Sequence, residues 1–139
     1  VPGAPAADAA VKRENGAEDW LLSVLSKDAP TGFAALVHLG DGAAPDLAAL
    51  ADRLGGDPVP VKIYAVSDTA RAVPSNVTLL VDSRGDFRRR YDAEPGTTYL
   101  LRPDHHVTAR WRECDAGLIR AARDRALAIT SQKVKEEAA

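Results

Sequence analysis

At 139 residues with 45% hydrophobic side chains, the chain is long enough for one domain with a buried core and too short for two. Its 18 basic and 20 acidic residues give a net charge of -2 without a basic stripe, which argues against nucleic acid or anionic lipid as a partner. Cys114 is the single cysteine, so an intrachain disulfide and a CxxC motif are excluded, and a reducing cytoplasm is the expected location. No apolar run approaches the ~20 residues of a membrane span, so no membrane partner is expected.

The N-terminal residues predict a small hairpin and a short helix. Asn15-Gly16 favours a tight turn within a hairpin or loop. Asp19 precedes the apolar residues of WLLSVL, a pattern typical of a helix cap followed by a helix with one apolar face.

The next segments predict a strand, a helix and a second strand. Residues 33–39 (FAALVHL) are almost continuously apolar between two glycines, as in a strand that is buried on both faces. A helix is expected over residues 45–54, ended by two glycines, and an alternating strand over residues 59–66. This order implies a parallel pair of strands with a right-handed crossover.

The second half of the chain predicts a strand, a short helix, an antiparallel hairpin and a closing helix. These elements are expected over residues 77–81, around Phe87, over residues 97–101 and 107–112, and over residues 115–129. Pro103-Asp104 suits the centre of the hairpin turn, since proline presets the first torsion and aspartate can bond to the backbone two residues on. We expect one domain over residues 1–130 and a charged, frayed tail over residues 131–139.

A βαβ unit followed by a ββα unit predicts an α/β fold of the thioredoxin-like class, with peroxiredoxin-like topology and helices on both faces of a central mixed sheet. In that fold the thiol chemistry lies in the loop after the first central strand, where a helix N-terminus stabilises a thiolate. The corresponding loop, residues 40–45, contains no cysteine. Thr97 stands where redox-active thioredoxins carry a cis-proline, and Pro95 comes two residues earlier. We therefore expect no catalytic residue in this chain.

Cys114 leaves one alternative open. It could act as a displaced nucleophile in an independent thiol oxidoreductase or a peroxiredoxin-like protein. Its position after the hairpin, at the start of the last helix, favours a structural thiol.

Asp104, His105 and His106 raise the question of a metal site. Adjacent side chains on a turning backbone diverge, and no nearby histidine or cysteine completes a ligand set, so a turn is the preferred interpretation and no metal ligand is predicted. His38, inside the first apolar strand, is expected to be a core or interface histidine whose hydrogen bonds are satisfied.

Arg88-Arg89-Arg90 is predicted to form a solvated face, because Asp82, Asp86 and Asp92 balance its charge. The chain contains neither a Gly-rich dinucleotide loop nor a phosphate-binding loop, so no cofactor-binding residue is expected.

Residues 79–113, LLVDSRGDFRRRYDAEPGTTYLLRPDHHVTARWRE, resemble the C-terminal thioredoxin-like domain of FAD-dependent aromatic-ring hydroxylases. These are flavin monooxygenases of the phenol hydroxylase and polyketide hydroxylase type. The segments LRPD (residues 101–104) and ARWR (residues 109–112) match well, although the family more often has glycine in place of His105. PGAPAADAAV (residues 2–11) and WLL (residues 20–22) also resemble the beginning of that domain.

The resemblance implies that the chain is one part of a larger, FAD- and NAD(P)H-dependent monooxygenase. Other domains would bind both cofactors and the aromatic substrate, and this domain would pack on them or support a homodimer. The absence of methionine fits either a processed start before Val1 or a piece of a longer protein. On this interpretation the role is structural or concerns assembly, and Phe87, Tyr99, Trp111 and Arg112 are core or docking residues. A free-standing binding module for a separate flavoprotein remains the other alternative.

Overall fold

The computed structural model describes residues 3–29, 31–42 and 45–138. Seven strands form one mixed sheet in the order β2-β1-β5-β4-β3-β6-β7. The strands are β1 (Ala10–Arg13), β2 (Glu18–Trp20), β3 (Phe33–Gly40), β4 (Val61–Ser67), β5 (Thr78–Val81), β6 (Thr98–Leu101) and β7 (Val107–Trp111). The helices are α1 (Leu21–Asp28), α2 (Leu47–Gly55), α3 (Asp86–Arg90) and α4 (Ala116–Ala138).

The centre of the sheet is parallel and its flanks are antiparallel. β3 pairs in parallel with β4, and β4 with β5, so the carboxyl ends of these three strands lie along one edge. β6 and β1 pair antiparallel with the outer sides of this group. The predicted parallel pair and the predicted β6-β7 hairpin are both confirmed.

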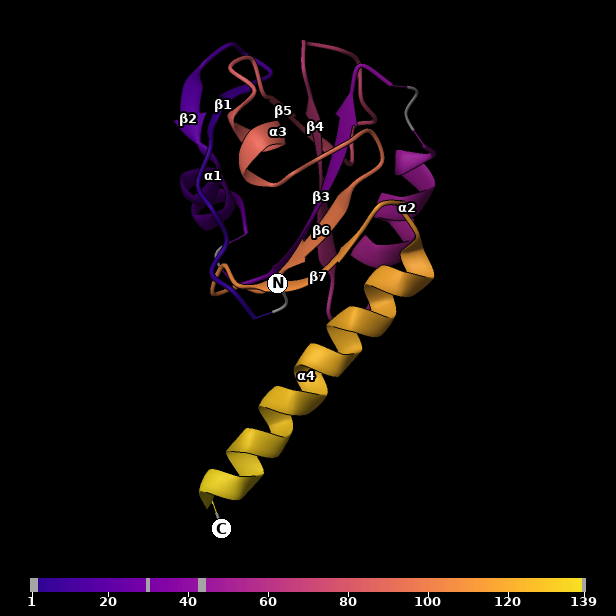
Figure 1. The fold of residues 1–139 in the computed structure, drawn as a ribbon. Helices are drawn as coiled ribbons and strands as arrows, with labels where there is room; N and C mark the ends of the chain where they lie inside the picture. Colours follow the sequence, from indigo (N-terminus) through magenta and orange to yellow (C-terminus); the bar gives the residue numbers. More distant parts are fainter. Residues whose placement is uncertain (1–2, 30, 43–44, 139) are drawn as a thin grey trace.

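Helices cover both faces of the sheet, as expected for this class of fold (Figure 1). All eight residues of β3 are buried, because alternate side chains enter two different core clusters. Residues such as Ala35 and Val37 pack with α2 and α4, whereas Ala34 and Leu36 pack with α1 and α3. The predicted strand buried on both faces is therefore confirmed.

The N-terminal hairpin forms, but Asp19 does not cap α1. β1 and β2 pair through the turn that contains Gly16, and β1 also extends the sheet beside β5. Asp19 belongs to β2 and its carboxylate accepts a hydrogen bond from the amide of Trp20. Pairing with β1 extends the chain through Trp20, so the helix starts one residue later than expected.

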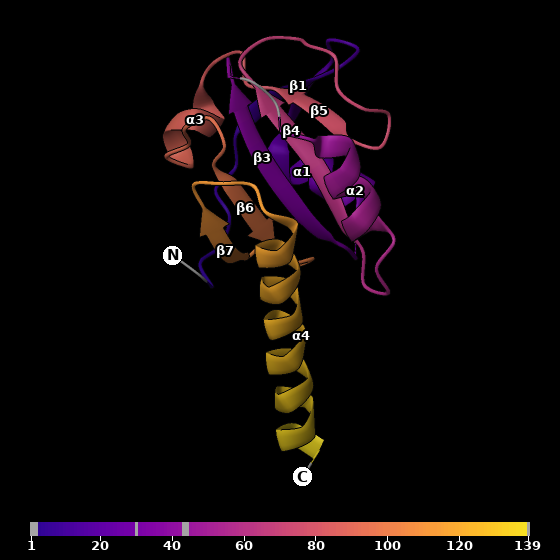
Figure 2. The same ribbon diagram turned by 90° about the vertical axis from the view of Figure 1, so that its right-hand side faces the viewer.

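The last helix is longer than the sequence pattern suggested. α4 continues to Ala138 instead of ending near residue 129, so the backbone of residues 131–138 is helical. Residues 130–138, TSQKVKEEA, contain neither glycine nor proline to end a helix. Figures 1 and 2 show the C-terminal half of α4 extending beyond the body of the domain. In the part of the chain that is described, no helix is long and apolar enough to span a membrane.

Candidate functional site

The loop after β3, where a thioredoxin-like fold would carry its thiol, packs tightly against Pro95. Gly40 has a φ of +57°, and a Cβ atom there would lie 3.3 Å from the Pro95 ring. A Cβ atom at Gly42 would lie 3.1 Å from the same proline. A cysteine at either position would force the loop or the proline to move. Ala43 and Ala44 lie outside the described residues.

The segment before β6 is joined to the end of β3 through the backbone. The amide of His38 donates to the carbonyl of Thr97 at 2.9 Å, and the amide of Gly96 donates to the carbonyl of His38 at 2.7 Å. Thr97 is fully buried, and every peptide bond of the described residues is trans. The position at which redox-active thioredoxins carry a cis-proline is therefore occupied by a buried threonine with a trans peptide bond.

Cys114 is half-buried and packs at the margin of the core cluster under α2 and α4. Burial raises the pKa of its thiol, and Asp115 raises it further, while a hydrogen bond with Thr98 acts in the opposite direction. Less thiolate is thus present at neutral pH than in an ordinary cysteine, and the environment is the reverse of that of an activated thiol.

Three chemically active side chains meet at the carboxyl ends of the parallel strands. His38 comes from β3, Asp68 directly follows β4 and Asp82 directly follows β5. One ligand atom from each lies within 4.8 Å of the other two, and His38 Nε2 is 3.9 Å from Asp68 Oδ1. Ligand sites of open α/β sheets gather at this edge, because loops from neighbouring strands meet there.

The members of this cluster, His38, Asp68 and Asp82, differ in exposure. His38 and Asp82 are almost completely buried, at 1% and 2% exposure. Asp68 keeps 31% of its side chain exposed and has Arg88 Nη1 3.8 Å from its second oxygen. The cluster therefore has a buried floor and one side open to solvent.

The expectation that the hydrogen bonds of His38 are satisfied is wrong. The structure buries the residue, but neither ring nitrogen has a hydrogen-bond partner among the described residues. Its neighbours Ala34 and Leu36 share its face of β3, so the apolar pattern of the strand concealed a polar site. A signal did exist in the sequence, since Asp68 and Asp82 each follow a buried strand.

Asp104, His105 and His106 form a turn. The amide of His105 donates to the carbonyl of Arg102 at 2.9 Å, which places Pro103 and Asp104 at the centre, as predicted. His105 takes the left-handed conformation, with a φ of 61°. Arg102 binds Asp104 through two hydrogen bonds of 3.0 and 2.7 Å and lowers the pKa of that carboxyl to about 2.

Two of the four candidate docking residues belong to the core. Phe87 is fully buried and Tyr99 is 6% exposed. Both lie against Tyr91, with Phe87 stacked at 4.4 Å and Tyr99 edge-on at 4.9 Å between ring centroids. The Tyr99 hydroxyl donates to the Tyr91 carbonyl. They hold α3 against the sheet and offer no surface to a partner.

The other two, Trp111 and Arg112, keep accessible surface at the β7 edge. Trp111 is half-buried, and Arg112 donates to the carboxylate of Asp92 at 2.9 Å, which lowers the pKa of that carboxyl. Sequence reasoning missed Trp20, which is 51% exposed at the end of β2 and borders a shallow hollow with Lys12. Trp111 and Trp20 thus lie on opposite edge strands of the sheet.

The arginine run of α3 is exposed, and each of its side chains has a polar partner. Arg89 donates to Asp86 at 2.7 Å, and Arg90 donates to the carbonyl of Asp8 at 2.7 Å. Arg88 lies beside Asp68. Of the three predicted partners, Asp86 binds a side chain of the run, whereas Asp82 accepts from backbone amides and Asp92 binds Arg110 and Arg112. The partners of Arg88 and Arg90, Asp68 and the Asp8 carbonyl, were not predicted.

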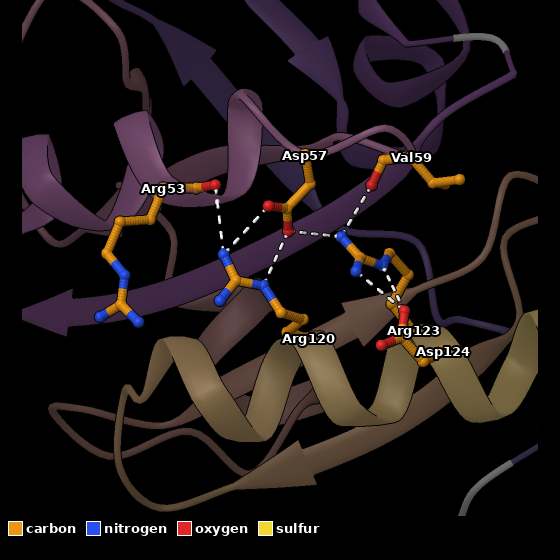
Figure 3. Close-up of polar contacts among 6 residues, drawn as sticks. All are labelled: Arg53, Asp57, Val59, Arg120, Arg123 and Asp124. Carbon is orange, nitrogen blue, oxygen red and sulfur yellow. Dashed lines mark hydrogen bonds and ion pairs between the residues drawn. The ribbon is translucent and has the colours of Figure 1, made fainter.

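A second polar cluster fastens α4 to the loop before β4, and no local pattern in the sequence announced it. Figure 3 shows Asp57 between Arg120 and Arg123. Arg120 donates to both carboxylate oxygens, at 2.9 and 3.0 Å, and Arg123 donates to one of them at 2.7 Å. Arg123 also donates to the carbonyl of Val59 and to Asp124. Hydrogen bonds from Arg120, which has the larger effect, and from Arg123 lower the pKa of Asp57.

Comparison with solved structures gives the fold class. The thiol peroxidase from Chromobacterium violaceum superposes with a TM-score of 0.69 and 14% identity, over 91% of this chain and 87% of that chain. A thiol:disulfide interchange protein DsbE from Chlorobium tepidum superposes with a TM-score of 0.65 and 18% identity, over 92% and 96% of the two chains. The fold is thioredoxin-like.

A flavoprotein is also similar in structure. The complex of aklavinone-11 hydroxylase with FAD and aklavinone superposes with a TM-score of 0.59 and 22% identity. The match covers 86% of this chain and 20% of the hydroxylase. Neither a protein-family model nor a curated protein matches the sequence.

Proposed function

We propose that this chain is a redox-inactive thioredoxin-like domain of an FAD-dependent monooxygenase of the aromatic hydroxylase type, with a role in stability or assembly. The observation that carries the proposal is the tight packing at the carboxyl end of β3. Glycines at positions 40 and 42 pack against Pro95 where this fold would carry a thiol, and no cysteine occupies the loop.

The similarity to aklavinone-11 hydroxylase supports the flavoprotein assignment. That enzyme contains a region that matches most of this chain at 22% identity, within a much longer polypeptide. On this proposal FAD, NAD(P)H and the aromatic substrate bind to other domains of the same polypeptide. This chain supplies a rigid sheet that packs on those domains or on a second copy of the enzyme.

Trp111 and Arg112 are the candidate docking residues that retain accessible surface. Large aromatic side chains and arginine are enriched in protein interfaces, because both bury area while keeping directed polar contacts. β7 is an edge strand, and residues 3–6 cover only its beginning through bonds to Val107 and His105. The end of β7 that carries Trp111 is the part we expect to face a neighbouring domain.

The size of the native polypeptide is the first test. An antibody raised against this chain should detect, in lysate of the source cell, a band several times heavier than 14.7 kDa that follows a yellow, FAD-containing fraction. A band near 14.7 kDa would overturn the proposal and favour an autonomous protein. Stoichiometric FAD binding by the isolated chain would contradict it as well.

The similarity to a thiol peroxidase supports a second candidate function, that of an independent thiol enzyme that uses Cys114. The raised pKa and partial burial of that thiol argue against it. Peroxidase and disulfide-reductase assays of Cys114→Ser beside the parent chain decide the matter. Equal rates remove this function, and a loss confined to the variant establishes it.

A further inference from the structure

His38 is a buried histidine whose ring nitrogens both lack a partner within the described residues. Burial removes water from polar atoms, and native proteins compensate by hydrogen bonds, bound water or a coordinated ion. The ring is also held in place, since Phe87 stacks on it at 5.8 Å and a Cβ atom at Gly40 would lie 3.3 Å from its Cε1 atom. An imidazole that is held in place and has a nitrogen without a hydrogen-bond partner is suited to coordinate a metal ion.

Two carboxylates lie where such an ion would bind. The potential ligand atoms of His38, Asp68 and Asp82 all fall within 4.8 Å of one another. Zinc bonds to nitrogen and oxygen of ~2.0–2.2 Å bring tetrahedral ligand atoms to roughly 3.4 Å apart. The widest separation in the set therefore has to close by up to about 1.4 Å. Asp68 can supply its own part of this movement, because it lies 3.9 Å from His38 Nε2 and its side chain is 31% exposed.

Asp82 is already positioned by the backbone. Its two oxygens accept hydrogen bonds from the amides of Phe87 and Arg88 at 2.9 and 3.0 Å. Each oxygen of an ionised carboxylate has a further lone pair, so these bonds orient the group and leave it able to bind a cation. Arg88 also lies 3.8 Å from Asp68 and is 54% exposed, so it can move aside when a cation binds.

We propose that His38, Asp68 and Asp82 bind one divalent transition-metal ion of the zinc class at the carboxyl ends of β3, β4 and β5. One imidazole with two carboxylates suits zinc, whereas calcium and magnesium prefer ligand sets made of oxygen alone. Three protein ligands leave the fourth position to water or another small ligand, on the side that Asp68 leaves open. This site does not depend on the proposed monooxygenase assignment.

Zinc titration of the metal-free chain tests the site. After dialysis against EDTA, free zinc at a hundredfold excess over its Kd should raise the Tm by roughly 9 °C. Asp68→Asn should abolish most of this rise, and because the side chain is 31% exposed and keeps its size, the variant should fold like the parent chain. His106→Ala is the matched control, because His106 Nδ1 lies 3.3 Å from Asp104 on the surface hairpin and could bind zinc weakly. This variant should respond like the parent chain.

Cobalt locates the ion without relying on a variant. Substoichiometric Co²⁺ should broaden the amide NMR signals of residues 38, 68 and 82 and leave those of residues 104–106 sharp. The proposal is overturned if zinc leaves the Tm unchanged. It is also overturned if Asp68→Asn responds like the parent chain, or if the broadening centres on the hairpin.

Discussion

The Asp57 cluster and the His38 cluster are both polar groups set into a hydrophobic domain, but their partners are distributed differently. Asp57 receives three hydrogen bonds from Arg120 and Arg123, and Arg123 makes further bonds to Val59 and Asp124. His38 is more deeply buried than any of these side chains, and its ring nitrogens have no hydrogen-bond partner in the described part of the chain. The Asp57 cluster holds α4 against the loop before β4. The His38 cluster contains ring nitrogens that have no hydrogen-bond partner among the described residues. Buried polarity alone therefore does not identify a functional site, and unmet bonding capacity is the better criterion.

The largest expected effect concerns the Asp57 cluster. Asp57→Ala removes the acid that binds both Arg120 and Arg123, leaves the 6% exposed Arg123 with the exposed Asp124 as its acidic partner, and should lower the Tm by roughly 10 °C. Asp124→Ala is the matched control. It removes the other acid from the same arginine, but that acid is 60% exposed and its loss should cost only roughly 2 °C. Thermal unfolding followed by circular dichroism measures both. Equal losses would remove the distinction drawn between the two acids.

The second prediction concerns the His38 cluster. Without metal, His38→Leu should stabilise the chain by about 1 kcal/mol, because it removes two buried nitrogens that lack partners. Urea unfolding in EDTA measures the change, with His106→Leu as a surface control that should have little effect. A loss of more than about 2 kcal/mol would mean that the His38 ring makes a stabilising polar interaction in the metal-free fold.

A third, smaller effect separates bonded from unbonded hydroxyl groups. Tyr64 is fully buried with a hydroxyl that lacks a partner among the described residues, and burial raises its pKa. Tyr64→Phe should gain about 0.5 kcal/mol in urea unfolding. Tyr91→Phe is the contrasting variant, since the Tyr91 hydroxyl donates to the carbonyl of Ala7, and should lose about 1 kcal/mol. Changes of the same sign would contradict the comparison.

The smallest effect concerns an exposed pair. Arg102 depresses the pKa of Asp104 to about 2 in the folded chain, so the pair stabilises the fold above the unfolded pKa near 4. That stability is lost as the pH falls toward 2. Because Asp104 is 55% exposed, solvent screening limits the contribution to less than about 0.5 kcal/mol.

Asp104→Asn measures this contribution directly. Between about pH 6 and pH 2.5, the urea midpoint of the parent chain should fall slightly more than that of the variant. A larger fall in the variant would reverse the sign and show that the ionised carboxylate is unfavourable in the folded chain.

The hairpin illustrates what sequence reasoning could reach. Pro103 and Asp104 define a turn within four residues, and their torsional and hydrogen-bonding preferences act locally. The turn therefore appears where it was predicted, with His105 in the left-handed conformation. The docking residues show the opposite case. The sequence alone does not show whether Phe87 and Tyr99 are core or surface residues. Their burial follows from the packing of α3 on the sheet.

Helix ends show another limit. The apolar stripe of α4 weakens after residue 129, and a frayed tail was expected for residues 131–139, yet the backbone stays helical through Ala138. Hydrophobic periodicity reports where a helix packs. It says little about where a polar helix stops when no glycine or proline is present.

The sequence by itself determined the types and order of the elements, the thioredoxin-like class and the lack of a cysteine in the loop after β3. These follow from side-chain periodicity and turn chemistry, which operate over a few residues. Only the tertiary structure brought together His38, Asp68 and Asp82, and placed Asp57 against α4. Those contacts depend on the order of strands in the sheet and on the helix packed across it, and spacing along the chain does not specify either one.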